Sequence, residues 1–579
     1  HSFPTRRSSD LAYTLSAVQT NAVEKILLSQ FDTDSVNVTT VAADLMNGVT
    51  TVGFTASGAD GDTTFTGLKN AVGAEMRNGA ADLTLSYVST VLAGAADTQT
   101  LTVSGDTGGT FTADGAETIA ITSELAASKI TNVSSNTLKA VTVAGSADLT
   151  ITTALTAATI DANAATGAVN VTLGSATQKV TGGSGNDVVD ANTNLSSADT
   201  VAGGAGNDTL KLSVGNATVA VGTTASKGAL FNVTGFEVID IASTNDAATL
   251  DLDTTTGVTT VVAAANTKTV TFATAAVNNT AIAFTLNGVS YSTAATDGTA
   301  TVAEAGVLLT TKINSIAGFS ASDDGAGVVT IVSTTGEAIE IGSFSGGMIA
   351  ANTTVSAYSN VAFANMAAGQ AVDIYSGNAV TASLKDASGT ADVLNVNLKT
   401  TSGDKGFDKS VGTVTANNIE TINLSANGMT DGKVTTVGAL TGNAMKTLNI
   451  TGDSDVTISA FTSSTALTTI DGSTSSGDLS LAAAPAAKDQ SIKTGSGNDT
   501  IAMGAYLTAA DTIDGGANNV PAGGTTVGKD KLTATGNIGT ATTAAALKIA
   551  NVETIEVATG GAAATYIDAA AVTGATTMA

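Results

Sequence analysis

Gly182-Gly183-Ser184-Gly185-Asn186-Asp187-Val188-Val189-Asp190 is a nonapeptide of the form G-G-x-G-x-D-x-U-x, in which U is apolar. Residues 203–211 repeat it as G-G-A-G-N-D-T-L-K. Glycine adopts backbone conformations that other residues resist, so each glycine run predicts a tight turn. The apolar residue two positions after the Asp then begins a short strand whose side chain faces the core. The pattern predicts the stacked turns of a parallel β-roll.

The same residues predict a calcium site. A glycine turn of this kind leaves carbonyl oxygens pointing inward, and the Asp adds a carboxylate. Ca²⁺ selects such hard oxygen ligands. Asp187 and Asp208 are therefore the first candidates, and the expected carbonyl ligands belong to Gly183, Gly185, Gly204 and Gly206.

The spacing of the two motifs predicts how their carboxylates meet. The motifs start 21 residues apart, whereas successive motifs of an ideal roll follow about every nine residues. Two motif lengths come close to this distance. We therefore expect Asp187 and Asp208 to face each other one turn apart, with three extra residues looped out. This departure from the ideal roll leaves the number of ions open.

A further copy far downstream indicates that the chain arose by duplication. Thr494-Gly495-Ser496-Gly497-Asn498-Asp499 repeats the first motif with Thr494 in place of its first glycine. Asp499 lies 312 residues after Asp187, and Asp511 lies 312 residues after Asp199. The constant offset is hard to obtain by chance.

The downstream copy predicts a second metal site. We expect Asp499 and the carbonyl of Gly497 to bind calcium there. Asp511, and Asp199 in the first copy, are candidates to complete a metal site. A fourth motif beginning at Gly515 is degraded, because an insertion separates its glycines from residues 529–532.

A fainter strand pattern, x-E-T-I-x-I, gives the number of repeats. Each glutamate of this pattern follows a predicted strand that begins with Asp and continues with apolar residues. The four glutamates are Glu117, Glu237, Glu420 and Glu553. We expect each to face solvent or to bond the backbone of the next turn; a calcium ligand or a lattice contact is the alternative. Sequence periods of this kind imply stacked units that share one continuous core.

The repeats and their spacing predict the domain organisation. The expected β-repeat units are 12–130, 131–274 with calcium loops, 349–436, and 437–579 with degenerate calcium loops. The sequence of the last unit follows that of an earlier repeat and ends partway through it, so we expect the chain to be an internal fragment.

An inserted module at 275–348 explains why the second and third glutamates are 63 residues further apart than the first two. Residues 284–291 predict a hairpin with an Asn-Gly turn. Val302–Ile316 has apolar residues at helical spacing, and strands are expected again at 328–332 and 338–341. The order predicts a small α+β module, whose function is not readable from the sequence.

Composition supports an all-β architecture, a parallel β-solenoid of β-roll-like repeats around this module. Of the 579 residues 43% are apolar and only 4% aromatic, with no Trp, so Val, Ile, Leu and Ala must fill thin core layers. Three prolines, 62 glycines and abundant Thr alternating with apolar residues favour strands and tight turns. Outside the module, Leu15–Leu28 is the only helical candidate.

The charge of the chain restricts its partners. A net charge of −27 argues against nucleic acid, which requires a basic footprint, and against adsorption to anionic lipid. Divalent cations would relieve the self-repulsion, although solubility alone explains the charge equally well. The absence of Cys leaves no disulfide framework and is compatible with export. No apolar run approaches the ~18 residues that span a bilayer, so we expect no membrane-spanning segment.

Residues 1–11 differ in character from the rest of the chain. They resemble a translated sequencing adapter, and we expect this leader to be non-native. The pair Arg6-Arg7 suggests a twin-arginine export signal as an alternative, but no suitable apolar region follows it.

We expect no catalytic site in this chain. A zinc protease needs H-E-x-x-H and a triad hydrolase needs a His base, whereas the only histidine is His1, inside the leader. A glycosidase site built from a pair of carboxylates is a formal alternative. Sugar clefts usually carry aromatic platforms, which this composition scarcely provides.

The chain resembles the surface-layer and related β-strand-repeat proteins of Gram-negative bacteria that carry RTX-type calcium motifs. The resemblance rests on the nonapeptides, on x-E-T-I-x-I and on residues 383–392, and it spans all but the leader and the module. It implies a β-solenoid that binds Ca²⁺, leaves the cell by type I secretion and self-assembles into a lattice on the cell surface, where a glycan anchor is an open question.

Two other functions remain open. A calcium-dependent adhesin or biofilm protein would share the repeats but needs a binding module, for which residues 275–348 are the only candidate. A secreted RTX enzyme would carry its catalytic domain elsewhere in the gene product, with this chain as its non-catalytic repeat region.

Overall fold

The computed structural model describes the chain with gaps. The described residues are 14–15, 23–29, 39–59, 61–214, 217–243, 247–263, 267–297, 301–333, 339–348, 353–355, 360–375, 377–400, 406, 408–482, 488–517, 529–535, 547–558, 572–573 and 577–578. The chain divides into two compact units: residues 1–213, 220–240 and 254–258 form the first, and residues 214–219, 241–253 and 259–579 the second.

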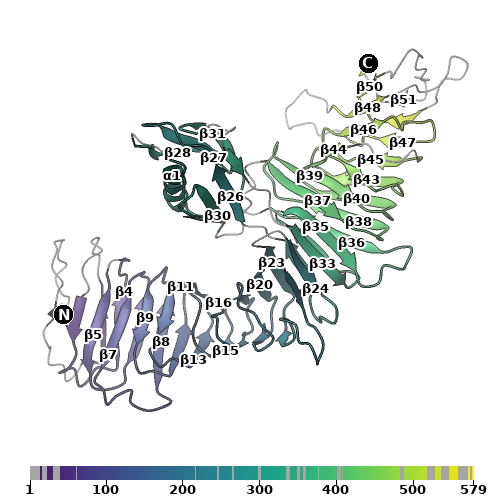
Figure 1. The fold of residues 1–579 in the computed structure, drawn as a ribbon. Helices are drawn as coiled ribbons and strands as arrows, with labels where there is room; N and C mark the ends of the chain where they lie inside the picture. Colours follow the sequence, from purple (N-terminus) through teal and green to yellow (C-terminus); the bar gives the residue numbers. More distant parts are fainter. Residues whose placement is uncertain are drawn as a thin grey trace, which may run out of the picture. The chain divides into compact units, whose positions relative to one another are not determined.

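The first unit is a parallel β-solenoid. Consecutive strands of the chain alternate between sheets, and each strand pairs in parallel with a strand of the neighbouring coil (Figure 1). One sheet contains β1 (Thr14–Leu15), β3 (Thr39–Ala42), β5 (Thr63–Leu68), β7 (Leu83–Tyr87), β9 (Thr110–Ala113) and β12 (Asn132–Ser134). A second contains β2 (Lys25–Leu28), β4 (Thr51–Thr55), β6 (Gly73–Arg77), β8 (Thr98–Ser104), β10 (Thr118–Ser123), β13 (Ala140–Gly145), β15 (Thr159–Ala165), β17 (Lys179–Thr181), β19 (Thr200–Ala202) and β22 (Val233–Thr234). A third series contains β11 (Ser128–Ile130), β14 (Leu149–Ile151), β16 (Val169–Thr172), β18 (Val188–Asp190) and β20 (Thr209–Val214).

The second unit contains a solenoid of the same kind. One series of parallel strands is β25 (Thr260–Ala263), β34 (Ala371–Ile374), β36 (Val393–Leu398), β38 (Thr421–Ala426), β40 (Thr447–Gly452), β43 (Thr469–Ser475), β45 (Ser491–Lys493), β47 (Thr512–Asp514), β49 (Lys548–Ala550) and β51 (Val572–Thr573). The other is β24 (Ala247–Asp251), β33 (Asn360–Met366), β35 (Gly377–Leu384), β37 (Lys409–Thr415), β39 (Val434–Thr441) with β42 (Phe461–Thr462) beside it, β41 (Asp455–Ile458), β44 (Leu479–Leu481), β46 (Thr500–Gly504), β48 (Lys531–Thr535), β50 (Thr554–Ala558) and β52 (Thr577–Met578). Three strands, β20, β21 (Ala217–Ala220) and β23 (Val238–Ser243), have residues in both units.

Alternation along each strand explains why these segments form a solenoid. In β10, Ile119 and Ile121 are buried, whereas Thr118 is half-buried and Thr122 exposed. The parallel register places apolar side chains of neighbouring coils next to each other, since Ile119 pairs with Val141 of β13. Each coil therefore adds one thin layer of aliphatic side chains to the core, as the composition predicts.

The module is an insertion into one coil, because β25 resumes its parallel pairing at β34, after the module. It has an antiparallel sheet in the order β29-β30-β26-β32, with β29 (Phe319–Asp323), β30 (Val328–Ser333), β26 (Thr267–Phe272) and β32 (Thr353–Val355). A second sheet has the order β28-β27-β31, with β28 (Val289–Ala295), β27 (Ala281–Leu286) and β31 (Ile341–Gly346). The helix α1 (Val302–Asn314) packs Ala305, Leu309 and Ile313 into the core of the module.

The structure differs from the sequence expectations at several elements. The sheets of the module include β26 and β32, outside the expected 275–348, and an additional strand, β29. The expected strand at 338–341 starts only at Ile341; residue 338 lies outside the described part of the chain. The helical alternative for Leu15–Leu28 is wrong for the described residues, because β1 and β2 are strands of the first unit. Among the described residues no helix has the length and apolar character needed to span a bilayer.

Candidate metal centre

The two nonapeptide loops lie one above the other at one edge of the first solenoid. Residues 182–187 connect β17 to β18, and residues 203–208 connect β19 to β20. Val188 pairs in parallel with Thr209, so one coil spans 21 residues here. The amide of Asp187 donates to Oδ1 of Asp208 at 2.8 Å. The two aspartates thus face each other one turn apart, as their spacing predicts.

The carboxylates of these loops continue as a ladder along the solenoid. Asp187 accepts hydrogen bonds from the amide of Val169, at 2.7 Å, and from that of Gly183, at 2.6 Å. On the other side, the amide of Asp208 donates to Oε2 of Glu237 at 2.8 Å. Each carboxylate therefore holds a backbone amide of the neighbouring coil.

One oxygen of this ladder has no partner. Oδ2 of Asp208 is buried and accepts no hydrogen bond, and the residue is fully buried. Burial raises the pKa of Asp208, and the charges of Asp187 and Glu237 raise it further, against the hydrogen bond from the Asp187 amide. Burial likewise raises the pKa of Asp187. A buried carboxylate oxygen without a donor fits a cation, since a lone negative charge is costly to bury.

The glycines of the motif allow the loops to approach each other. A Cβ on Gly182 would lie 1.7 Å from the carbonyl oxygen of Gly203, so only glycine fits there. Gly204 and Gly206 have φ of +106° and +139°, which favours glycine. A Cβ on Gly204 would lie 2.3 Å from the Gly183 oxygen, and one on Gly206 would lie 2.2 Å from the Gly185 oxygen. The carbonyls of the first loop therefore point toward the second.

Backbone oxygens would supply most ligands of a cation here. Within the described residues, no three His, Cys, Asp or Glu side chains form a group that could hold a metal ion. Calcium takes six to eight oxygen ligands, and carbonyls serve as well as carboxylates. The expected ligand Gly183 accepts the amide of Ala205 at 2.9 Å, which leaves its carbonyl a second lone pair.

Asp199 lies at the opposite edge of the coil from these loops, because residues 191–199 connect β18 back to β19. Its Oδ2 accepts from the amide and the hydroxyl of Ser196, at 2.9 and 2.8 Å. Its Oδ1 accepts from the amide of Gln178 at 2.7 Å. Oδ2 thus closes a turn and Oδ1 holds an amide of the preceding coil, and the structure does not bring Asp199 to Asp187.

The downstream copy repeats this arrangement in the second unit. Asp499 lies between β45 and β46, is fully buried, and accepts from the amide of Leu479 at 2.7 Å. Asp511 lies between β46 and β47, at the other edge, where it accepts from the amides of Gln490 and Thr508, each at 2.6 Å. Asp499 and Asp511 are therefore as far from sharing a site as Asp187 and Asp199. The expected ligand Gly497 approaches the preceding coil so closely that a Cβ there would lie 2.6 Å from the oxygen of Gly477.

Sequence reasoning missed Asp530, which takes the position of Asp208 in the second unit. Its Oδ1 accepts the amide of Asp499 at 2.7 Å, as Asp208 accepts that of Asp187. A Cβ on Gly515 would lie 2.9 Å from its Oδ2, and one on Gly203 would lie 2.7 Å from Oδ2 of Asp208. The strand that follows, with Leu532 paired to Ile501, matches that of Asp208 in the sequence pattern, but the insertion before Asp530 keeps this residue out of the predicted ligands.

The four recurring glutamates have one common role. Each glutamate side chain accepts a hydrogen bond from the backbone amide of an Asp that lies at the start of a strand in the preceding coil. The pairs are Asp97 to Glu117 at 2.9 Å, Asp208 to Glu237 at 2.8 Å, Asp392 to Glu420 at 3.1 Å and Asp530 to Glu553 at 2.8 Å. The expected bond to the next turn is wrong, because each glutamate binds the backbone of the preceding turn. We call each such pair an Asp–Glu clamp.

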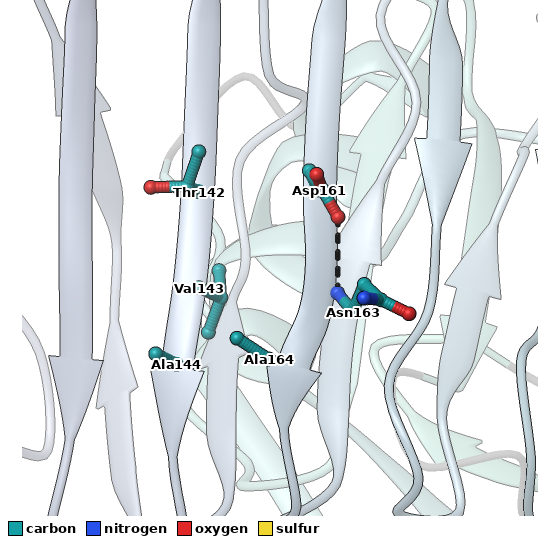
Figure 2. Close-up of a pocket in the computed structure, with 6 residues that line it drawn as sticks. All are labelled: Thr142, Val143, Ala144, Asp161, Asn163 and Ala164. Carbon is teal, nitrogen blue, oxygen red and sulfur yellow. Dashed lines mark hydrogen bonds between the residues drawn. The ribbon is translucent and has the colours of Figure 1, made fainter.

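A small pocket lies away from all of these loops, on β13 and β15 (Figure 2). Thr142, Val143, Ala144 and Ala164 line it together with Asp161, whose Oδ1 accepts the Asn163 amide at 3.0 Å. It forms where the pairing of the two strands shifts register. Its volume of 160 Å³ lies below the ~300–1,000 Å³ of typical ligand pockets.

The fold and these loops define a parallel β-solenoid with stacked glycine–aspartate turns. The family model of the RTX calcium-binding nonapeptide repeat matches the chain at residues 177–194 and 195–219, the coils that contain Asp187 and Asp208. This part of the chain thus consists of RTX calcium-binding repeats. No curated protein matches the chain.

Proposed function

We propose that this protein is a structural surface-layer protein whose β-solenoid folds and assembles on the cell surface with Ca²⁺. The observation that carries the proposal is the unpartnered, buried Oδ2 of Asp208 between two stacked loops. The RTX repeats that contain it support calcium as the ion and an extracellular location.

The residues of the loops account for a folding switch. Without a cation, the carboxylates of Asp187, Asp208 and Glu237 lie in one ladder and repel one another, which opposes stacking of their coils. Calcium, when bound, supplies the positive charge and the additional ligand bonds that offset this repulsion. The chain then stays loose in a calcium-poor cytoplasm, which suits export by type I secretion, and its coils close outside the cell.

The energies are sufficient for such a switch. Extracellular calcium modules bind at about 10⁻⁴–10⁻³ M. At a calcium concentration tenfold above Kd, each site contributes about 1.4 kcal/mol. A few coupled sites therefore decide whether a domain of ordinary stability, about 5–15 kcal/mol, is folded.

Assembly is the part of the proposal that separates a surface layer from other calcium-dependent repeat proteins. The purified chain, dialysed from EDTA into calcium, is expected to form ordered two-dimensional arrays that electron microscopy detects. A chain that folds with calcium but remains monomeric would contradict the surface-layer function. Binding of glycans or host cells by such a monomer would instead indicate an adhesin.

A further inference from the structure

The inserted module has an edge strand with one side unpaired. β28 lies at one end of the sheet β28-β27-β31, and within the described part of the chain it pairs only with β27. The exposed residues of this strand are Val289, Ser290, Ser292, Ala294 and Ala295. A free edge presents backbone N–H and C=O groups that can pair with a further strand.

The hairpin determines which of these backbone groups point outward. Its turn has two residues, both with positive φ, so Leu286 and Val289 close it as a hydrogen-bonded pair. Hydrogen-bonded and non-hydrogen-bonded pairs alternate along an antiparallel ladder, which places Ser290 and Ser292 in non-hydrogen-bonded pairs with β27. The amides and carbonyls of these two serines therefore point toward the free edge.

Two other edge strands of the module are blocked. On β29, the side chain of Asn314 accepts a hydrogen bond from the amide of Ala321 at 2.7 Å and donates one to the carbonyl oxygen of the same residue at 3.0 Å. On β31, the pairing with β27 shifts register, and Ser343 has a φ of +51°. Such irregularity hinders the pairing of a further strand. By contrast, the register of β28 is regular from Val289 to Ser292.

The charge of the chain favours a second copy as the partner at this edge. Two molecules with a net charge of −27 repel each other. Residues 269–296, which include β27 and β28, contain no charged residue, although 13% of the chain is charged. Two copies can therefore approach each other along this hairpin at a smaller electrostatic cost than along an acidic surface.

We propose that β28 pairs antiparallel with β28 of a second copy. The inference rests on the proposed function, because it names one contact of that assembly. A two-fold axis at Tyr291 pairs Ser290 of each copy with Ser292 of the other, so that their outward amides and carbonyls bond to each other.

This pairing covers apolar surface that the module leaves open. Tyr291 is half-buried against Phe284, with 5.8 Å between the ring centroids, and Val289 is 52% exposed. Across the axis, the two Tyr291 side chains form a non-hydrogen-bonded pair, the closer of the two kinds of pair in an antiparallel sheet. Aromatic pairs of this kind stabilise a sheet.

Cysteine cross-linking of the full chain tests the contact, because the chain contains no Cys. Tyr291→Cys places two thiols in a non-hydrogen-bonded pair, whose Cα separation of about 4.5 Å lies within the range that a disulfide bridges. With oxidised glutathione, this variant is expected to give at least tenfold more disulfide-linked dimer than Ser322→Cys, whose exposed thiol lies on β29. The dimer is expected in EDTA and in calcium, because the module contains no nonapeptide.

Two substitutions of one residue separate strand pairing from random collision. Ser292→Pro, introduced into the Tyr291→Cys chain, removes an outward N–H that β27 does not use. It is expected to reduce the yield of dimer about tenfold, because each copy loses a hydrogen bond to the other. Ser292→Ala retains the N–H and should leave the yield unchanged.

The outcomes separate this inference from the function on which it rests. Equal yields from Tyr291→Cys and Ser322→Cys overturn the pairing of two copies and leave the edge to a strand of another protein, whether or not Ser292→Pro folds. An undiminished yield from Ser292→Pro overturns it as well. Ordered arrays in calcium without this cross-link overturn the contact and leave the proposed function standing. Cross-linked dimers without arrays support the contact and contradict the surface-layer function.

Discussion

Two of the aspartates that were expected to bind a metal, Asp208 and Asp199, differ in the hydrogen bonding of their second oxygen. Asp208 is fully buried with an unpartnered Oδ2, whereas both oxygens of Asp199 accept hydrogen bonds within the structure. A carboxylate whose bonds are already satisfied stabilises a turn. One that is buried and unsatisfied destabilises the fold until a cation or a proton reaches it.

Substitution at the two positions should therefore have different calcium dependence. The double variant Asp187→Ala, Asp208→Ala is expected to abolish most of the calcium-induced rise in melting temperature of the first unit. It removes both the expected carboxylate ligands and their hydrogen bonds to the neighbouring coils. Asp199→Ala should reduce stability by about 1–3 kcal/mol to the same extent in EDTA and in calcium. Melting curves followed by circular dichroism measure both effects. An unchanged calcium-induced shift of the melting temperature in the double variant would contradict the assignment of Asp187 and Asp208 as calcium ligands.

Protonation should relieve the buried negative charge of Asp530. Its folded pKa is raised to about 7 from an ordinary value of 3.8. A raised carboxylate pKa contributes stability that is fully present below the unfolded pKa and is lost as the pH rises through the folded pKa. In EDTA, the melting temperature is therefore expected to fall between pH 5 and pH 8, and Asp530→Asn should flatten this dependence. A melting temperature in EDTA that rises over this interval would contradict it.

At the scale of elements, the clamp ties each repeat to the coil before it. The Asp392 amide donates to Glu420, while Lys446 approaches the same glutamate from the following coil. Three coils are thus linked through one carboxylate. Stacked strands in a solenoid contact only their neighbours, so such links determine whether stability propagates along it.

Removal of one clamp should destabilise its coils with or without calcium. Glu420→Ala leaves the half-buried amide of Asp392 without an acceptor and is expected to reduce the free energy of unfolding by about 1–3 kcal/mol. Glu420→Gln retains an amide oxygen and should recover much of the loss. Urea unfolding in EDTA provides the measurement, and equal stability of Glu420→Ala and the unmodified chain would refute the role of the clamp.

The elements also show how far the sequence could predict the structure. Period-two alternation and the glycine turns predicted the strands and the 21-residue coil at Asp187 and Asp208, because both are local properties. The strand pattern before Glu553 matched Asp530 to Asp208, but the insertion separates Asp530 from its glycines, so Asp530 was not among the predicted ligands. Likewise, Asp199 and Asp187 are close in sequence, yet the flattened coil places them at opposite edges. The Leu15–Leu28 segment has apolar residues that fit a helix, but pairing of its ends with β3 and β4 favours strands.

At the scale of the whole molecule, charge and repetition act together. A chain with a net charge of −27 and a core of thin aliphatic layers gains little from any single coil. Cations that bind between coils strengthen every layer they join. The proposed function therefore depends on calcium-driven folding of a repetitive chain, to which the first pair of loops contributes through its RTX repeats.

Circular dichroism and light scattering during a Ca²⁺ titration of the EDTA-treated chain test this claim most directly. We predict a cooperative gain of β-sheet signal at about 10⁻⁴–10⁻³ M calcium, followed by growth of large assemblies. A chain that is folded and monomeric in EDTA and does not respond to calcium would contradict calcium-driven folding and assembly, and would leave the loops as inert turns of a β-solenoid.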